Sequence, residues 1–388
     1  MAKDPVCGMN VDEAKALRLT RGSETYYFCS KHCLLKFAKD AHIDNKELSI
    51  CLVKPNTKWY QNKLLITVSA LAMLVIFSYQ FSILTPFRQT LVMYFQKIWF
   101  AVLLGLILGG VIDHFVAREY VSHVLSRPKK RTIFYSVILG FFMSACSHGI
   151  LALSIELHKK GASNPAVVAF LLASPWANLP LTIMLVSLFG WKGLYIVISA
   201  LIIALTTGFI YQFLDSKDLI ERNKNIKTTR EDFFIFEEIK KNFAAYKFNM
   251  ETIKKDVKGV FSGSISLANM VLWWILIGIG LASLAGAYIP HDIFHKYMGP
   301  TAMGLFVTLA LATVLEVCSE GTAPLAFEIY RQTLALGNAF VFLMAGVVTD
   351  YTEIGLLWFN VGKRVAIFLP LVTVPQVVAL GILANKIF

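Results

Sequence analysis

Thiol, imidazole and carboxylate groups gather at two places in the larger, C-terminal part of the chain. They are Cys146, Ser147 and His148 in the first group and Glu316, Cys318, Ser319 and Glu320 in the second. Thiolates and imidazoles bind soft and borderline metal ions, while carboxylates can take up or release protons. The two groups therefore predict a site for a thiol-reactive metal or metalloid species, gripped by Cys146 and Cys318.

The two groups lie 172 residues apart, and the same offset aligns the segments around them without a gap. Two Cys-Ser-x-Gly motifs coincide, as do Glu156 with Glu328 and Asn178 with Asp350. Chance similarity between apolar segments explains such polar matches poorly, so we infer an internal duplication. Asn178 and Asp350 thereby join the predicted substrate site. The carboxylates predicted to couple the site to protons are Glu316, Glu320, Asp350 and Glu353.

The elements that position these groups are apolar. The chain of 388 residues is 56% hydrophobic and 16% charged, against about 45–50% and about 25% in globular proteins, which excludes an ordinary soluble enzyme. Stretches long enough to cross about 30 Å of hydrocarbon predict spans at 64–84, 98–116, 165–189, 193–214, 264–289, 336–359 and 365–387. Two further apolar stretches, 133–157 and 301–329, are interrupted where the two polar groups lie.

Basic residues indicate the orientation of these spans, because Lys and Arg concentrate in cytoplasmic loops. The basic segments are 1–63, 118–131, 215–259 and Lys363-Arg364. All four lie in the cytoplasm if each interrupted stretch is a re-entrant hairpin with its Cys-Ser motif at the tip. The net charge of +12 then marks one face of a membrane and does not indicate nucleic-acid binding.

We therefore predict an all-α polytopic protein of the cell (inner) membrane. Two inverted-topology repeats, 98–214 and 260–388, each contain three spans and a re-entrant hairpin and are joined by a cytoplasmic loop at 215–259. One extra span at 64–84 precedes them. Transporters built this way hold substrate near the midplane on interrupted helices. The interpretation leaves the oligomeric state open, a homodimer included.

A small polar head at 1–50, followed by a linker at 51–63, carries four of the six cysteines. Cytoplasmic thiols are reduced, so metal binding is favoured over a disulfide. A β element ending at Cys29 and a helix with Cys33 predict an α+β head in which Cys7 completes a three-thiolate site. The Asp-Pro-Val-Cys-Gly-Met and Tyr-Tyr-Phe-Cys-Ser motifs resemble a YHS domain. That resemblance implies a zinc or copper ion held by Cys7, Cys29 and Cys33, with His32 as a weaker ligand.

The body resembles permeases of the ArsP-type family over residues 98–388. The resemblance rests on the Cys-Ser-x-Gly motifs, on Ala-Phe-Leu-Leu-Ala-Ser-Pro at 169–175 and on Thr-Asp-Tyr-Thr-Glu at 349–353. It implies a secondary transporter, not an enzyme, that exports trivalent arsenicals or related thiophilic species. One departure is His148, where many members carry a third cysteine.

Other interpretations stay open. One is a transporter of a soft or borderline ion such as Cu(I), Zn(II) or Hg(II), and another is a membrane thiol-disulfide relay between Cys146 and Cys318. Glu156 and Glu328 are placed at the hairpin bases, where pairing with Lys159 or Arg331 is as good an explanation as proton coupling. Three histidines and two aspartates are interpreted as interfacial caps: Asp113, His114, His291, Asp292 and His295.

Overall fold

The chain divides into two compact units, Met1–Ile66 and Thr67–Phe388. The computed structural model describes residues 2–6, 10–11, 17–21, 24–28, 34 and 37, and then 63–115, 125, 130–143, 147–159, 161–223, 249–315 and 319–388. In the first unit, strands β1 (Ala2–Lys3) and β2 (Asn10–Val11) pair antiparallel, as do β3 (Leu17–Arg21) and β4 (Glu24–Phe28). Leu19, Phe28 and Leu34 form its small core.

The predicted β element of the head ends where expected, because β4 stops at Phe28, one residue before Cys29. The four candidate metal ligands, Cys7, Cys29, His32 and Cys33, lie outside the described residues. Their metal site therefore stays a prediction.

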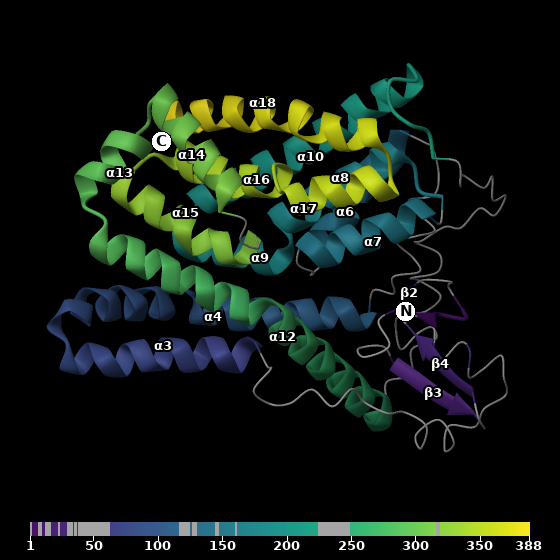
Figure 1. The fold of residues 1–388 in the computed structure, drawn as a ribbon, viewed down its shortest axis with the longest axis horizontal. Helices are drawn as coiled ribbons and strands as arrows, with labels where there is room; N and C mark the ends of the chain where they lie inside the picture. Colours follow the sequence, from purple (N-terminus) through teal and green to yellow (C-terminus); the bar gives the residue numbers. More distant parts are fainter. Residues whose placement is uncertain are drawn as a thin grey trace. The chain divides into compact units, whose positions relative to one another are not determined.

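The second unit is built from helices (Figure 1). In chain order they are α3 (Lys63–Gln80), α4 (Thr85–Phe115), α6 (Lys130–Phe142), α7 (Ser147–Lys159), α8 (Asn164–Ala177), α9 (Leu179–Phe189), α10 (Lys192–Ser216), α12 (Met250–Tyr288), α13 (His291–Met298), α14 (Ala302–Val314), α15 (Ser319–Thr333), α16 (Leu336–Val348), α17 (Tyr351–Asn360) and α18 (Lys363–Ile387). In the part of the chain that the structure describes, six helices are long and apolar enough to cross a membrane, or up to eight if bent pairs count as one span. The protein is a multi-pass membrane protein.

Several bounds differ from the sequence-based spans. Helix α4 begins at Thr85, well before the predicted start of its span, because Pro86 suits the first turn of a helix. Helix α12 begins at Met250, inside the segment predicted as a loop. The predicted helix breaks are confirmed: α8 and α9 meet at a bend of 41° at Asn178, and α17 begins after Asp350.

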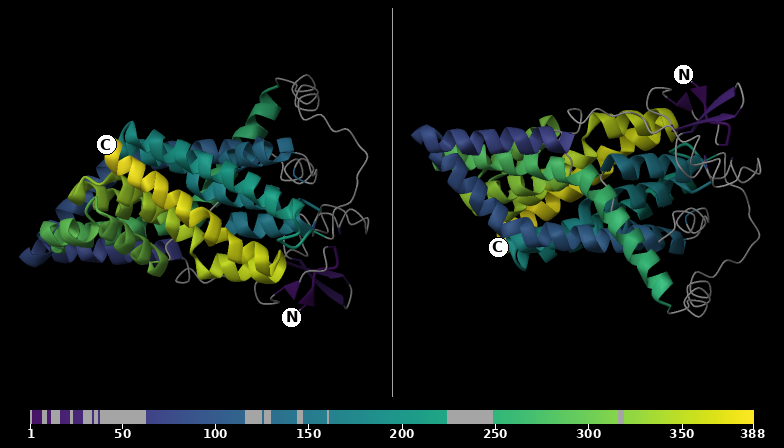
Figure 2. Two further views of the ribbon diagram at one scale, coloured as in Figure 1. Left: turned by 90° about the horizontal axis from the view of Figure 1, so that it is seen from above. Right: turned by 90° about the horizontal axis from the view of Figure 1, so that it is seen from below.

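The helix bounds follow the offset of 172 residues. Both ends of α14 lie 172 positions after those of α6, and α15 begins 172 positions after α7. One pair of helices related by this offset, α10 and α18, runs in opposite directions. Tyr195 and Tyr211 of α10 donate to the carbonyls of Leu380 (3.0 Å) and Val365 (2.7 Å), which sets α10 antiparallel to α18 (Figure 2).

Helices α6 and α7 run out and back beside α8. At the far end of α6, the Ser174 hydroxyl of α8 donates to the Met143 carbonyl at 3.0 Å, and a Cβ on Gly140 would touch Ala173. Helix α6 is therefore parallel to α8. Helix α7, which lies between these two in the sequence, runs in the opposite direction. Each arm has 13 residues, which gives about 20 Å at 1.5 Å per residue, less than the hydrocarbon thickness.

A loop carboxylate, Glu221, caps the N-terminus of α18. Its oxygens accept hydrogen bonds from the backbone N–H of Arg364 at 3.0 and 3.1 Å and of Val365 at 3.3 Å. The N-cap residue, Gly362, has no side chain to do this, and a Cβ there would lie 2.5 Å from a Glu221 oxygen. The cap joins the segment after α10 to the start of α18.

This cap makes the stability of the protein depend on pH. Partial burial works to raise the pKa of Glu221, but the N–H groups of Arg364 and Val365 and the Arg364 charge outweigh it and lower the pKa. A carboxyl with a lowered folded-state pKa stabilises the protein above its unfolded value of about 4.3 and loses this effect as the pH falls through the folded value.

We therefore expect Glu221→Gln to lower the midpoint of thermal unfolding at neutral pH, with the difference from wild type shrinking below about pH 4. Unfolding scans of both proteins in detergent between about pH 3 and pH 8 check this. A difference that stays constant across the range would contradict the role of the charge.

Candidate functional site

The two predicted break residues begin the helices that follow them. The Asn178 side-chain oxygen accepts from the backbone N–H of Leu181 at 2.8 Å at the start of α9. At the equivalent place, an Asp350 oxygen accepts from the N–H groups of Thr352 at 2.7 Å and Glu353 at 3.2 Å at the start of α17. Both side chains thus cap the N-terminus of a helix, where the helix dipole favours negative charge.

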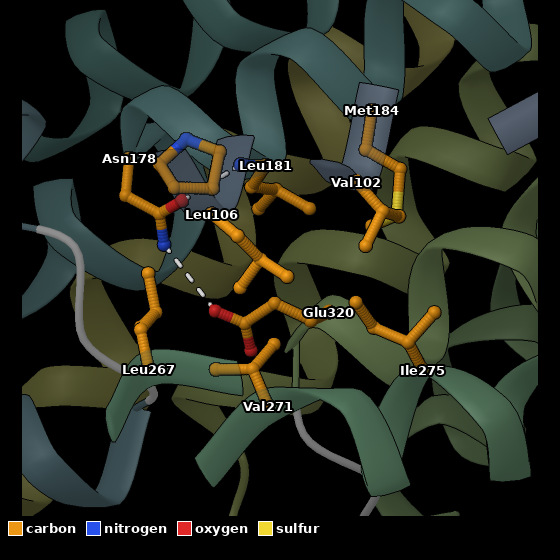
Figure 3. A pocket seen from close by; sticks show the side chains of 10 residues that line it. Val102, Leu106, Asn178, Leu181, Met184, Leu267, Val271, Ile275 and Glu320 are labelled. Atoms are coloured by element: carbon orange, nitrogen blue, oxygen red, sulfur yellow. Dashed lines mark hydrogen bonds between the residues drawn. The ribbon is translucent and has the colours of Figure 1, made fainter. Parts of the chain in front are cut away.

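Asn178 also joins the two halves of the body. Its amide nitrogen donates to an oxygen of Glu320, the second residue of α15, at 3.4 Å (Figure 3). The other Glu320 oxygen accepts from the Ser319 hydroxyl at 3.0 Å. Asn178 is 1% exposed and Glu320 4% exposed. Three of the predicted site residues therefore lie together in a buried position between helices from both repeats.

A small cavity lies against this pair. It measures about 20 Å³, which is room for about one water molecule. Figure 3 shows Asn178, from the break between α8 and α9, and Glu320 of α15 at this cavity, with apolar side chains completing the wall. Those side chains come from α4, α9 and α12: Val102, Leu106, Pro180, Leu181, Met184, Leu267, Val271 and Ile275.

Met184 is a wall residue that the sequence interpretation missed. Its thioether is a weak, soft donor and lines the same cavity as the Glu320 carboxylate. Helix α9 is apolar along nearly its whole length, so its sequence pattern does not distinguish Met184 from its neighbours. The cavity thus combines an amide, a carboxylate and a thioether.

Two turns along α4 from the cavity, aromatic rings close the space between α4, α9 and α15. Phe327 meets Tyr94 and Phe189 edge to face, with ring centroids 6.1 and 5.3 Å apart. Glu328 is 1% exposed and accepts a hydrogen bond from the Tyr94 hydroxyl and two from Arg331 at 2.7 and 3.0 Å. The predicted pairing of Glu328 with Arg331 is confirmed, whereas its repeat partner Glu156 is exposed.

The remaining predicted residues are placed less completely. Asp350, the N-cap of α17, and Glu353 in its first turn are both buried, and α17 packs against α7. Ser147 and His148 begin α7, but their side chains are outside the description. Glu316, Cys146 and Cys318 lie outside the described residues. Within the described residues, no three His, Cys, Asp or Glu side chains gather as a metal site.

His114, interpreted from the sequence as an interfacial cap at the end of its span, also contacts a second helix. Its Nε2 lies 3.0 Å from an Asp256 oxygen on α12. The pair links the last turn of α4 to the first turns of α12, as close approach of Gly259 to the His114 ring also shows. The role of this histidine is therefore to join two helices.

Comparison with known proteins agrees with this architecture. A family model named ArsP_1, described as a predicted permease, matches residues 64–386, and a YHS domain model matches residues 2–42. No solved structure matches the chain.

Three curated proteins are similar to the chain. UPF0718 protein YcgR of Bacillus subtilis is 24% identical over 290 residues, which cover 74% of this chain and 92% of that protein. A Streptococcus mutans protein named as a two-component membrane permease complex subunit is 21% identical, over 64% of this chain and 78% of its own length. Permease Rv2963 of Mycobacterium tuberculosis is 23% identical, over 60% of each. The chain therefore belongs to the ArsP_1 family of predicted permeases and carries an N-terminal YHS domain.

Proposed function

We propose that the protein is a secondary transporter that exports a thiophilic metal or metalloid species, such as a trivalent arsenical, from the cytoplasm. The observation that carries this proposal is the buried Asn178–Glu320 contact, which brings an interrupted helix of one half against the tip helix of the other beside a cavity. Substrate sites of repeat-built transporters lie at such interfaces.

An inverted topology is supported by the opposite directions of α10 and α18 and by the short, returning arms α6 and α7. In this topology the hairpin tips reach toward the midplane, and the head and the loop before α12 lie in the cytoplasm. The basic segments then share one side, as the positive-inside rule requires.

Alternating access is supported by an asymmetry in helix packing. Helix α4 packs on α9, and α12 packs on α15, around the aromatic cluster formed by Tyr94, Phe189 and Phe327. The offset of 172 relates the first of these pairs to α12 with α17, and the second to α4 with α7. Among the described residues, neither related pair packs comparably. If the helix pairs that now pack separated and the related pairs packed instead, the site would close on the opposite side of the membrane. This is the motion that inverted repeats permit.

The chemistry of the proposed site follows from its residues. Cys146 and Cys318 would bind the substrate. Each directly precedes a helix, α7 or α15, and the helices that pack against these two meet at the interface between the two halves. Ser147, His148, Asn178 and Ser319 would complete its surroundings. Four carboxylates would exchange protons during transport: Glu316, Glu320, Asp350 and Glu353.

The head would hold the same class of ion. Three thiolates, from Cys7, Cys29 and Cys33, with the His32 imidazole, are a donor set suited to Zn(II) or Cu(I). Since the Streptococcus relative is named as a complex subunit, a second subunit or a second copy of this chain is a further proposed partner.

Uptake by inside-out vesicles tests the proposal. We expect vesicles with the wild-type protein to accumulate arsenite or methylarsenite under a proton gradient, and Cys146→Ser with Cys318→Ser to reduce uptake at least about tenfold, since loss of outer-sphere support alone weakens metal sites by 10- to 100-fold. Cys51→Ser is the control and should leave uptake unchanged. Equal uptake by wild type, the double variant and Cys51→Ser would contradict the proposal that Cys146 and Cys318 bind the substrate.

The same vesicles rank the substrates. Antimonite, Cu(I), Zn(II) and Hg(II) are presented in parallel, with and without the gradient. Uptake of Zn(II) in preference to the metalloids would replace the arsenical in the proposal by a borderline ion, in line with His148 at the first tip.

A further inference from the structure

Two histidines face each other on the short helix α13. His291 and His295 are four residues apart, a spacing that puts both side chains on one face of a helix. Their ring centroids are 5.7 Å apart, and both residues are exposed. The buried Phe294, next to His295 in the chain, packs α13 against the body. The imidazole pair is therefore presented to solvent by an anchored helix.

The separation of the rings suits a shared metal ion. An imidazole nitrogen binds zinc at about 2.0–2.1 Å, so two rings on one ion have centroids roughly 5 to 6 Å apart. The observed 5.7 Å falls in this range. Zinc, nickel and copper all accept imidazole nitrogen.

The hydrogen bonds around His291 determine which of its nitrogens is available. The Gln332 amide nitrogen donates to a Glu328 oxygen at 2.7 Å, so the Gln332 oxygen is turned to His291 Nδ1, 3.1 Å away. An amide oxygen only accepts hydrogen bonds, so Nδ1 must carry the proton. The lone pair is then on Nε2, free for a metal, and the ring is oriented as metal-binding histidines usually are.

We propose that His291 and His295 form a binding site for a borderline divalent cation, Zn²⁺ in the first instance, on α13. No third His, Cys, Asp or Glu joins them among the described residues, so water would complete the coordination and binding would be reversible. The site does not depend on the proposed transport function. In the proposed topology it faces the side to which the substrate is released.

The Gln332 link gives the site a connection to the body. Gln332 joins His291 to Glu328, and Glu328 joins α15 to Tyr94 of α4. A metal on His291 would strengthen the Nδ1–H donor and so tighten this chain of hydrogen bonds. An ion at α13 would therefore favour the contact of Tyr94 on α4 with Glu328 on α15.

Zinc titration of the purified full chain in detergent tests the proposal. All thiols are alkylated first, so that the cysteines of the head and tips do not bind the metal. We expect wild type to bind one more Zn²⁺ per chain than His291→Ala with His295→Ala, and Lys296→Ala, an exposed change on the same helix, to match wild type. Gln332→Ala should weaken the same site about tenfold.

Two outcomes would overturn the proposal: a double variant that binds as many zinc ions as wild type with the same affinity, or a wild type that binds none.

Discussion

Replacing Glu320 by glutamine is expected to reduce substrate uptake by about 100-fold, which corresponds to about 2.7 kcal/mol of activation free energy. Glu320 is the acidic residue that lines the cavity, and it is 4% exposed. Glutamine keeps the size of the side chain and an oxygen that can accept from Asn178. The substitution therefore removes the negative charge and the proton site while leaving the contact between the two halves in place.

The control for this experiment is Glu156→Gln. Glu156 lies on the returning arm of the other hairpin but is exposed, so the same chemical change there should leave uptake near the wild-type rate. Vesicle uptake and proton flux are measured for both variants, with size-exclusion profiles to show that each is folded. If Glu320→Gln transported substrate and protons at the wild-type rate, the carboxylate would have no part in the mechanism.

A single methyl group at Gly278 should destabilise the protein by about 1–3 kcal/mol, the usual cost of overpacking. A Cβ at this position of α12 would lie against the backbone of Gly321 in α15, 2.7 Å from its carbonyl carbon. Backbone atoms cannot rotate away as a flexible side chain can, so the two helices must separate. Because Gly321 adjoins Glu320, the separation would also pull the carboxylate away from Asn178.

Gly355→Ala provides a matched comparison for Gly278→Ala. Gly355 also lies within a helix, but nothing lies within 4 Å of a Cβ there. Alanine favours a helix over glycine by about 0.5–1 kcal/mol, so this variant should be as stable as wild type or more so. Thermal unfolding in detergent gives the comparison. If Gly278→Ala unfolded at the same temperature as Gly355→Ala, α12 and α15 could separate without loss of stability.

Local sequence patterns predicted the helices and their interruptions. Long apolar stretches predict membrane helices because a span must satisfy its own backbone hydrogen bonds. Pro175 and Pro180 predict the break near Asn178, since proline removes a backbone donor, and Asn178 and Asp350 are good first-turn acceptors. The offset of 172 likewise predicted that helix bounds such as those of α6 and α14 would correspond.

Contacts between distant helices were beyond the reach of those patterns. Asn178 and Glu320 are 142 residues apart, and nothing in either local segment specifies that they meet. Equivalent residues in the two halves also have different surroundings, since Glu328 is buried with Tyr94 and Arg331 while Glu156 is exposed. The sequence places both carboxylates at the same repeat position and treats them alike.

The sequence by itself thus determined a multi-pass helical membrane protein and the residues with suitable chemistry, because hydropathy, charge and residue type are properties of short segments of the chain. Tertiary structure alone decided which of those residues share a cavity and which face solvent. It joined Asn178 to Glu320 and set His291 beside His295 with its Nδ1 held by Gln332. The reason is that such contacts depend on how closely whole helices approach, which backbone positions such as Gly278 and Gly321 permit.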